Sequence, residues 1–378
     1  MSASCPSPPR RQPRHDRGTR SPPMQSDWRS WDDGVALLGE ATGVVLILGA
    51  IDTGKTTLAT QAANGALARG HAVALVDGDT GQSELGPPGT IGLARPEAPF
   101  AAPSELRTRA LAFVGDITPV GHLLSIVSGL ECLTRHAQSR GAELILVDTA
   151  GLVRGRIAEK LHVATAAAIR PALVVGLARG SEIDRLIELV AAAAGAPSLR
   201  VRTPESVGYK TPLYRRARRA KRLAAWFESA RPIEVAAAQL VSFDGWPFTG
   251  TPLPPGVLRQ AAATFACDVY YGEETADGFY FCVEAAPAPG QLAALRDVLR
   301  QRIVATPAEW FRYLLVGAVR DDGRVAALGL LQGINFERRV YSLLTPAASL
   351  AGARLLHFGR LRAMPDGSEL GRLRPGDL

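Results

Sequence analysis

The stretch GAIDTGKTT at residues 49–57 decides the fold of this chain. It fits the pattern G-x-x-x-x-G-K-[ST] at every fixed position. A continuous apolar run at 43–48, typical of a buried strand, precedes it, and an Ala-rich helical pattern at 56–69 follows it. A phosphate-binding P-loop requires this order of strand, loop and helix, so the sequence predicts a bound nucleoside triphosphate.

Each part of the motif has a physical role. The glycines let backbone N–H groups turn around a phosphate, and the start of the helix adds partial positive charge. We expect Lys55 to reach the β- and γ-phosphates and Thr56 to offer its hydroxyl to Mg²⁺. The predicted ATP-binding residues are Gly49, Ala50, Ile51, Asp52, Thr53, Gly54, Lys55, Thr56 and Thr57.

Strand and helix patterns alternate after the P-loop. Further strands are expected at 71–77, 143–149, 172–177 and 198–203. Helices are expected at 120–140, 156–169 and 181–194. This alternation predicts a doubly wound, mostly parallel α/β sheet.

The pattern changes near residue 231, where Pro and Gly interrupt the chain. Short β-type runs follow, with a helix expected at 290–304. We therefore expect a disordered basic tail at 1–35, a P-loop domain at 36–230 and a smaller, β-rich α+β domain at 231–378.

Composition and charge limit the class of protein. The chain has 378 residues, 47% of them hydrophobic and 21% charged, as in ordinary globular proteins. No apolar run approaches the roughly 20 residues of a membrane helix, and no secretory signal is recognisable, which predicts a cytoplasmic protein. The net charge of +7 is concentrated in segments 1–30 and 209–222, as expected where an anionic partner binds.

Carboxylates follow two of the expected strands. Asp77 and Asp79 lie in VDGDTGQ, and Asp148 ends the strand LILVDTAG in the position of a Walker B acid. Ligands bind at the carboxyl ends of parallel strands, so these groups should lie beside the triphosphate. There they can hold Mg²⁺ or accept the proton of an attacking hydroxyl. The sequence DTAG also resembles the D-x-x-G of GTPases, but no N-K-x-D or T-K-x-D follows a later strand.

An Arg-rich segment lies at 209–227, and its pattern fits a helix with a basic face. Arg215, Arg219 and Arg222 are spaced i, i+4 and i+7, which puts them on one helical face. Phosphoryl transfer depends mainly on positioning and on stabilising negative charge, and both can come from arginines of a lid. Arginine is abundant throughout the chain, so its number alone indicates nothing.

Together these segments resemble the polynucleotide 5′-hydroxyl kinase family, which includes a subunit of the pre-mRNA cleavage factor and a kinase of ribosomal-RNA processing. GAIDTGKTT, VDGDTGQ with GPPGTIGL, FVGDITPVGH, DTAGLVRG and YRRARRAKRLAAWF carry the resemblance over about residues 40 to 230. It extends more weakly to LLQGINFERRVYSLLTP and LHFGRLRAMPDGSEL.

The resemblance implies transfer of the γ-phosphate of ATP to the 5′-hydroxyl end of RNA or DNA. Lys55, Asp79, Arg215, Arg219 and Arg222 would then be catalytic, with Asp79 orienting or deprotonating the hydroxyl. Mg²⁺ would be held by Thr56, Asp79 and Asp148. The substrate would be held by Asp77, Gln82, Pro88, Gly89, Thr149 and Gly151. The sequence identifies no protein partner.

Two departures from the family pattern keep other functions open. The family usually has Trp where this chain has Leu152, which removes an aromatic platform for a base. Eukaryotic relatives also have a β-rich domain ahead of the P-loop, where this chain has only the basic tail. An ATP-binding RNA-processing scaffold without kinase activity, or a P-loop ATPase or GTPase regulator, therefore remains an alternative.

Overall fold

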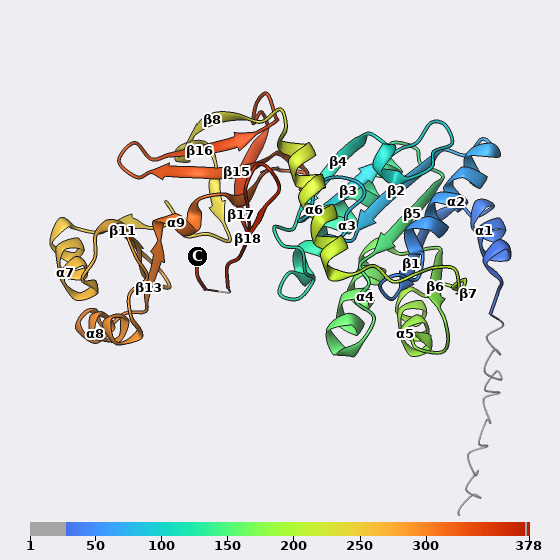
Figure 1. Ribbon diagram of the computed structural model, residues 1–378, viewed down its shortest axis with the longest axis horizontal. Coiled ribbons are helices and arrows are strands. Elements are labelled where there is room, and N and C mark those ends of the chain that lie inside the picture. Colours follow the sequence, from blue (N-terminus) through green and yellow to red (C-terminus); the bar gives the residue numbers. More distant parts are fainter. Residues whose placement is uncertain (1–27, 375) are drawn as a thin grey trace, which may run out of the picture.

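The computed structural model describes residues 28–374 and 376–378. These residues form a seven-stranded sheet, a second seven-stranded sheet and a four-stranded sheet. Figure 1 shows the first sheet with its helices on one side of the molecule and the other two sheets on the opposite side. Helix α6 (Pro212–Phe227) lies between the two sides. The expected disorder of residues 1–27 falls outside the described residues.

The first sheet has the strand order β4-β3-β2-β5-β1-β6-β7. Strands β2, β5, β1, β6 and β7 are parallel, whereas β3 and β4 are antiparallel additions at one edge. The strands are β1 (Gly43–Gly49), β2 (Val73–Gly78), β3 (Thr90–Ala94), β4 (Thr108–Phe113), β5 (Leu144–Thr149), β6 (Leu173–Ala178) and β7 (Ser198–Arg202). The expected doubly wound, mostly parallel sheet is confirmed, but β3 and β4 were not expected.

Helices cover both faces of this sheet, which explains the continuous apolar runs of its strands. The helices of this part are α1 (Trp31–Gly39), α2 (Lys55–Ala68), α3 (Leu123–Ser139), α4 (Gly155–Ile169) and α5 (Asp184–Ala194). One core cluster joins the sheet to α3, α4 and α5, and a second joins its other face to α1 and α2. β1 alternates between them, because Val44 and Leu46 face the first cluster and Val45 and Ile47 the second.

Helix α1 corrects the end of the expected tail. Residues 31–35 are helical, and the Ser30 side chain caps the helix by accepting a hydrogen bond from the backbone N of Asp33 at 3.1 Å. The sequence SDWRSWDDG lacks a clear apolar period, so the helix was not expected there. Leu38 is nevertheless fully buried against α2 and the sheet, which shows that tertiary packing stabilises α1.

The remaining chain is rich in β-strands, as expected. The second seven-stranded sheet has the order β18-β17-β14-β15-β16-β8, with β9 also paired to β17. The four-stranded sheet, β10-β11-β12-β13, is inserted between β9 and β14 together with α7 and α8. The elements are β8 (Arg231–Ala236), β9 (Val241–Phe243), β10 (Thr251–Pro252), α7 (Pro255–Phe265), β11 (Val269–Thr275), β12 (Gly278–Val283), α8 (Pro289–Leu299), β13 (Ile303–Pro307), α9 (Ala308–Phe311), β14 (Leu314–Arg320), β15 (Val325–Asn335), β16 (Val340–Thr345), β17 (Ala353–Ala363) and β18 (Glu369–Arg372).

Two helix boundaries differ from expectation. The helix expected at 290–304 ends at Leu299, and Ile303–Pro307 instead forms β13 parallel to β12. The helix expected from residue 120 begins at Leu123, because Gly121 adopts a left-handed backbone conformation with φ of 90°. The pairing of β13 with β12 explains the first boundary, and the turn at Gly121 explains the second.

Helix α6 and the loop after β4 join the two sides of the molecule. Leu223 and Phe227 of α6 pack with Phe113 of β4 and with Leu315 and Leu361 of the second sheet. The carbonyl of Gly115 accepts hydrogen bonds from the backbone N of Arg360 (2.8 Å) and of Leu361 (3.0 Å). The loop after β4 is therefore fixed directly against β17.

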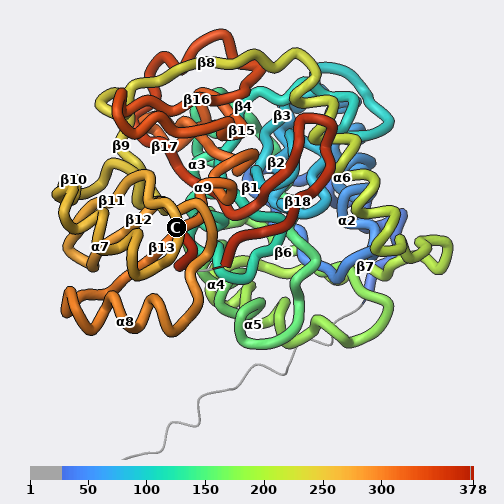
Figure 2. The backbone as a smooth tube through the Cα atoms, turned by 60° about the vertical axis from the view of Figure 1, so that its left-hand side comes forward, coloured from blue at the N-terminus to red at the C-terminus, as the bar shows by residue number. Residues whose placement is uncertain are grey.

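The turn between β17 and β18 lies against α6. A side chain at Gly367, whose φ is 86°, would collide with the carbonyl of Ala220 in α6. Figure 2 shows this part of the chain running beside α6. No helix of residues 28–374 and 376–378 has the length and apolar character needed to cross a membrane.

The packing of Phe227 yields a stability prediction. Phe227 is only 3% exposed, so Phe227→Ala should lower the free energy of unfolding by about 3–5 kcal/mol through lost burial and a new cavity. Urea unfolding followed by circular dichroism measures this loss. Leu213→Ala, at a 77% exposed position of the same helix, should change stability by less than about 0.5 kcal/mol. Equal stability of the two variants would contradict the packing role of Phe227.

Candidate active site

The P-loop lies between β1 and α2 and has the conformation that its glycines allow. Gly54 has a φ of 88°, in the left-handed region, and directly precedes α2. A side chain at Gly49 would lie 2.6 Å from Thr53 Oγ1 and 2.9 Å from the carbonyl of Leu177. Gly151 similarly allows the loop after β5 to approach Ile51. The fixed glycines therefore serve close backbone packing around the phosphate position.

Lys55 and Thr56 open α2 and face the end of β5. Lys55 is 7% exposed, and its Nζ donates a hydrogen bond to the carbonyl of Ala50 at 3.0 Å. Thr56 Oγ1 donates to Asp148 Oδ2 at 2.5 Å, which confirms that the P-loop and the end of β5 meet. The sequence positions that suggested a Walker A and a Walker B element thus form one cluster.

The chemistry of this cluster fits Mg²⁺. Asp148 Oδ1 is buried and has no hydrogen-bond partner within the described residues. Burial raises the pKa of Asp148, while Lys55 and Thr56 oppose the rise. Among the described residues, no group of three or more His, Cys, Asp or Glu side chains could hold a metal by itself. The hydroxyl of Thr56 and the free oxygen of Asp148 are the kind of ligands that Mg²⁺ takes together with substrate phosphates.

Asp77 and Asp79 have different surroundings although only one residue separates them. Asp77 is 6% exposed and accepts hydrogen bonds from the backbone N of Asp79, Glu84 and Leu85. Burial raises its pKa, and the nearby carboxylates Asp148 and Asp79 raise it further. Asp77 therefore organises the loop after β2.

Asp79 is the first residue of the loop after β2. Its Oδ1 accepts hydrogen bonds from the backbone N of Gly81 (3.1 Å) and Gln82 (3.0 Å), which fixes the orientation of the carboxylate. Asp79 lines the same cavity as Lys55 and Thr56. Gln82 lines it too, and its Oε1 is buried without a hydrogen-bond partner in the described part of the chain.

One cavity of about 950 Å³ brings most of the predicted residues together. Its wall contains thirteen of them: Ile51, Asp52, Thr53, Gly54, Lys55, Thr56, Thr57, Asp79, Gln82, Asp148, Gly151, Arg215 and Arg219. The cavity also reaches Leu152 and continues to residues 100–103 and 117–119. Such a volume is within the range of small-molecule sites.

Seven predicted residues do not line this cavity: Gly49, Ala50, Asp77, Pro88, Gly89, Thr149 and Arg222. Thr149 is buried, and its hydroxyl donates to the carbonyl of Ile47 at 2.7 Å. Gly89 is also buried, and its carbonyl accepts from the backbone N of Val114 and Gly115. These residues shape the loops that support the site.

The arginines of α6 pair with acidic groups and carbonyls from separate segments. Arg215 bonds Asp52 Oδ2 at 2.6 Å, which attaches the helix to the P-loop. Arg219 Nε bonds Glu369 Oε1 at 2.6 Å, and its guanidinium reaches Oε2 at 3.2 Å. Arg222 donates to the carbonyls of Glu84 and Gly86.

Sequence reasoning missed Arg218, which pairs with Glu84 and lines the cavity. Its spacing of i+3 from Arg215 places it on the same helical face, so the periodicity contained this signal. Glu84 and Glu369 gave no comparable signal, since each meets its arginine only through tertiary folding.

His162 of α4 is a second residue that the sequence did not reveal. It is 1% exposed, and its Nε2 lies 2.8 Å from the carbonyl of Leu152. Burial lowers the pKa of His162 to about 4, so the ring is neutral near pH 7 and donates its N–H to this carbonyl. His162 thereby supports the loop that carries Leu152 into the cavity.

The doubly wound sheet, the P-loop, the buried carboxylates and the arginine helix define the class: a P-loop protein built to act on a nucleoside triphosphate. The profile of the family described as "mRNA cleavage and polyadenylation factor CLP1 P-loop" matches residues 49–229.

Curated relatives extend the similarity beyond this region. The polyribonucleotide 5′-hydroxyl kinase of Thermococcus kodakarensis is 31% identical over 338 residues, which are 88% of this chain and 92% of the relative. The enzyme of the same name from Pyrococcus furiosus is 29% identical over 329 residues, 87% of this chain and 90% of the relative. The chain therefore belongs to the CLP1 family of P-loop kinases.

A solved structure agrees on the fold. The wild-type Clp1p–Pcf11p complex contains a chain that superposes with a TM-score of 0.51 at 12% identity. The match covers 87% of this chain and 76% of the solved one.

The buried state of His162 leads to a pH prediction. The unfolded chain binds a proton on His162 below about pH 6.5, whereas the folded protein resists this until about pH 4. The unfolded state thus binds more protons between these values, and stability falls as the pH drops through this window, by about 3 kcal/mol in total.

The His162→Gln variant should lose this part of the pH dependence, because Gln stays neutral and keeps an N–H donor. Denaturant unfolding at several pH values between 4 and 7 measures the difference. Parallel pH profiles of wild type and His162→Gln would refute the prediction.

Proposed function

We propose that this protein transfers the γ-phosphate of ATP to the 5′-hydroxyl end of a polynucleotide. The observation that carries the proposal is the presence of Asp79 in the same cavity as the P-loop residues Lys55 and Thr56. A carboxylate held beside the γ-phosphate position can accept the proton of a hydroxyl group. The names of the curated relatives, polyribonucleotide 5′-hydroxyl kinases, favour RNA as the acceptor.

The reaction can be written with this chain's residues. The 5′-hydroxyl oxygen bonds to the γ-phosphorus, the bond from that phosphorus to the β–γ bridging oxygen breaks, and ADP leaves. Asp79 orients the hydroxyl through Oδ2 and takes its proton, while the N–H groups of Gly81 and Gln82 hold Oδ1. Lys55 exchanges the carbonyl of Ala50 for phosphate oxygens and stabilises their charge.

Three further groups complete the proposed site. Thr56 and Asp148 would hold Mg²⁺, which neutralises charge on the β- and γ-phosphates when bound. Arg215, Arg218 and Arg219 line the cavity and supply positive charge above the phosphates. The free Gln82 Oε1 can accept a hydrogen bond from the terminal nucleotide.

Leu152 favours one alternative, an ATP-binding scaffold without transfer. It lines the cavity at the position where an aromatic ring would stack on a base, an interaction of about 1–3 kcal/mol. The lack of an aromatic ring at this position would weaken substrate binding but leave the catalytic groups unaffected, so we favour the kinase. The cytoplasmic location stays a prediction from the sequence.

The catalytic prediction uses purified protein, Mg²⁺, γ-labelled ATP and a 5′-hydroxyl RNA oligonucleotide. Lys55→Ala should abolish transfer, because the charge beside the γ-phosphate is lost. Asp79→Asn should lower kcat by about 10²- to 10⁴-fold while the Kd for ATP changes little, because only the proton acceptor is removed.

The matched control is Lys160→Ala, since Lys160 is an exposed lysine of α4 away from the cavity. It should transfer phosphate like the wild type. Binding of ATP without transfer to any RNA or DNA 5′-hydroxyl would refute the kinase and favour the scaffold. Oligonucleotide-independent hydrolysis faster than transfer would favour an ATPase.

A further inference from the structure

The loop at 115–122 separates the active-site cavity from a second cavity. Ile117, Thr118 and Pro119 line the active-site cavity. His122, at the end of the same loop, lines another cavity of about 440 Å³ between the two sides of the molecule. One short loop therefore forms a wall of both spaces.

This loop is firmly attached to the second large sheet. Asp116 is 5% exposed at its side chain and lies 3.3 Å from both His122 and Arg372 of β18. Burial alone would raise the pKa of Asp116, but His122 and Arg372 lower it, so the carboxylate is charged. Together with the bonds from Arg360 and Leu361 to Gly115, these contacts fix the second cavity relative to the active site.

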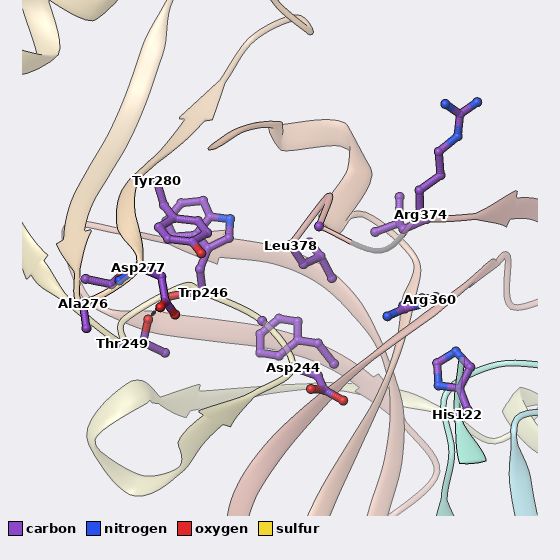
Figure 3. A pocket seen from close by; sticks show the side chains of 15 residues that line it. His122, Asp244, Trp246, Thr249, Ala276, Asp277, Tyr280, Arg360, Arg374 and Leu378 are labelled. Carbon is purple, nitrogen blue, oxygen red and sulfur yellow. Dashed lines mark hydrogen bonds between the residues drawn. The ribbon is translucent and has the colours of Figure 1, made fainter. Parts of the chain in front are cut away.

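The second cavity presents basic side chains of β17 and of the segment after β18. Figure 3 shows Trp246 and Tyr280 on one side, His122 on the other, and Arg360 between them. Arg374 lines the same cavity and also a third hollow of about 390 Å³. That third hollow adds Arg362, Arg372 and the partly exposed ring of Trp310.

The two hollows together contain four arginines, Arg360, Arg362, Arg372 and Arg374, and three aspartates, Asp244, Asp277 and Asp377. Among the ion pairs of the described residues, none involves Arg360 or Arg374. The acidic groups of the second cavity are Asp244, which pairs with His357 at 3.0 Å, and the exposed Asp277. Arg360 and Arg374 therefore offer two guanidinium groups that form no ion pair within the described part of the chain.

We infer that Arg360, Arg374 and Trp310 bind the polynucleotide strand beyond its 5′-terminal nucleotide. The inference rests on the proposed function, in which the 5′ end occupies the active-site cavity and the strand must leave it. Arginine forks bind phosphate oxygens in bidentate fashion, and an aromatic face accepts any base. The series of hollows thus fits a single-stranded, sequence-independent ligand.

The experiment compares a short and a long acceptor in the double variant Arg360→Ala/Arg374→Ala. For a 3′-labelled, single-stranded 5′-hydroxyl RNA of about twelve nucleotides, we expect Kd and KM to rise about tenfold or more. The slope of log K against log salt should fall by about 1.4, because two phosphate contacts are lost. The KM for a 5′-hydroxyl dinucleotide, and kcat for both acceptors, should stay unchanged.

The matched control is Arg354→Ala, because Arg354 is an exposed arginine of the same strand β17 that lines neither hollow. It should bind the long RNA like the wild type. The single variant Arg374→Ala, at an exposed position, tests the same surface with little risk to folding and should give part of the loss.

An equal effect on short and long acceptors, no effect on either, or the same loss in Arg354→Ala would overturn the inference. The binding measurement does not require turnover. Absence of transfer to every acceptor would therefore refute the kinase, whereas length-independent binding would refute only the strand surface.

Discussion

The burial of Leu223 and Phe227 fixes the position of α6, and the site depends on that position. These side chains lie at the carboxyl end of the helix, 0% and 3% exposed, between β4 and the second sheet. Arg215 lies twelve residues earlier, about 18 Å along the axis at 1.5 Å per residue. Because a helix is stiff over this length, anchoring one end in an apolar core orients the arginines at the other end over the P-loop.

The arginines also connect the site to the rest of the molecule. Arg215 pairs with Asp52 of the P-loop, Arg218 with Glu84 of the loop after β2, and Arg219 with Glu369 of β18. The β-rich part of the chain therefore contributes directly to the lid. Phosphates bound in the cavity would compete with these carboxylates, so the same contacts can hold the arginines in place before a nucleotide arrives.

Asp77 and Asp79 belong to one sequence motif at the end of β2, but they have different surroundings. Asp77 is turned inward and accepts the loop's N–H groups, whereas Asp79 lies on the cavity wall. The resemblance assigned Asp77 to substrate binding, but its burial and its backbone hydrogen bonds make it a support of the loop. A buried carboxylate that accepts three backbone N–H groups is committed to the loop, so Asp79 is left for the substrate.

The sequence by itself determined the P-loop, the mostly parallel direction of the strands in the first sheet, and the meeting of Thr56 with Asp148. Those features follow from local periodicity and from the rule that the carboxyl ends of parallel strands share one edge. It did not determine β3 and β4, helix α1, or the partners of the lid arginines. Arg219 and Glu369 are 150 residues apart, and no local pattern encodes such a pair. Only the tertiary structure, by packing the second sheet against β4 and α6, decided which arginines face the cavity.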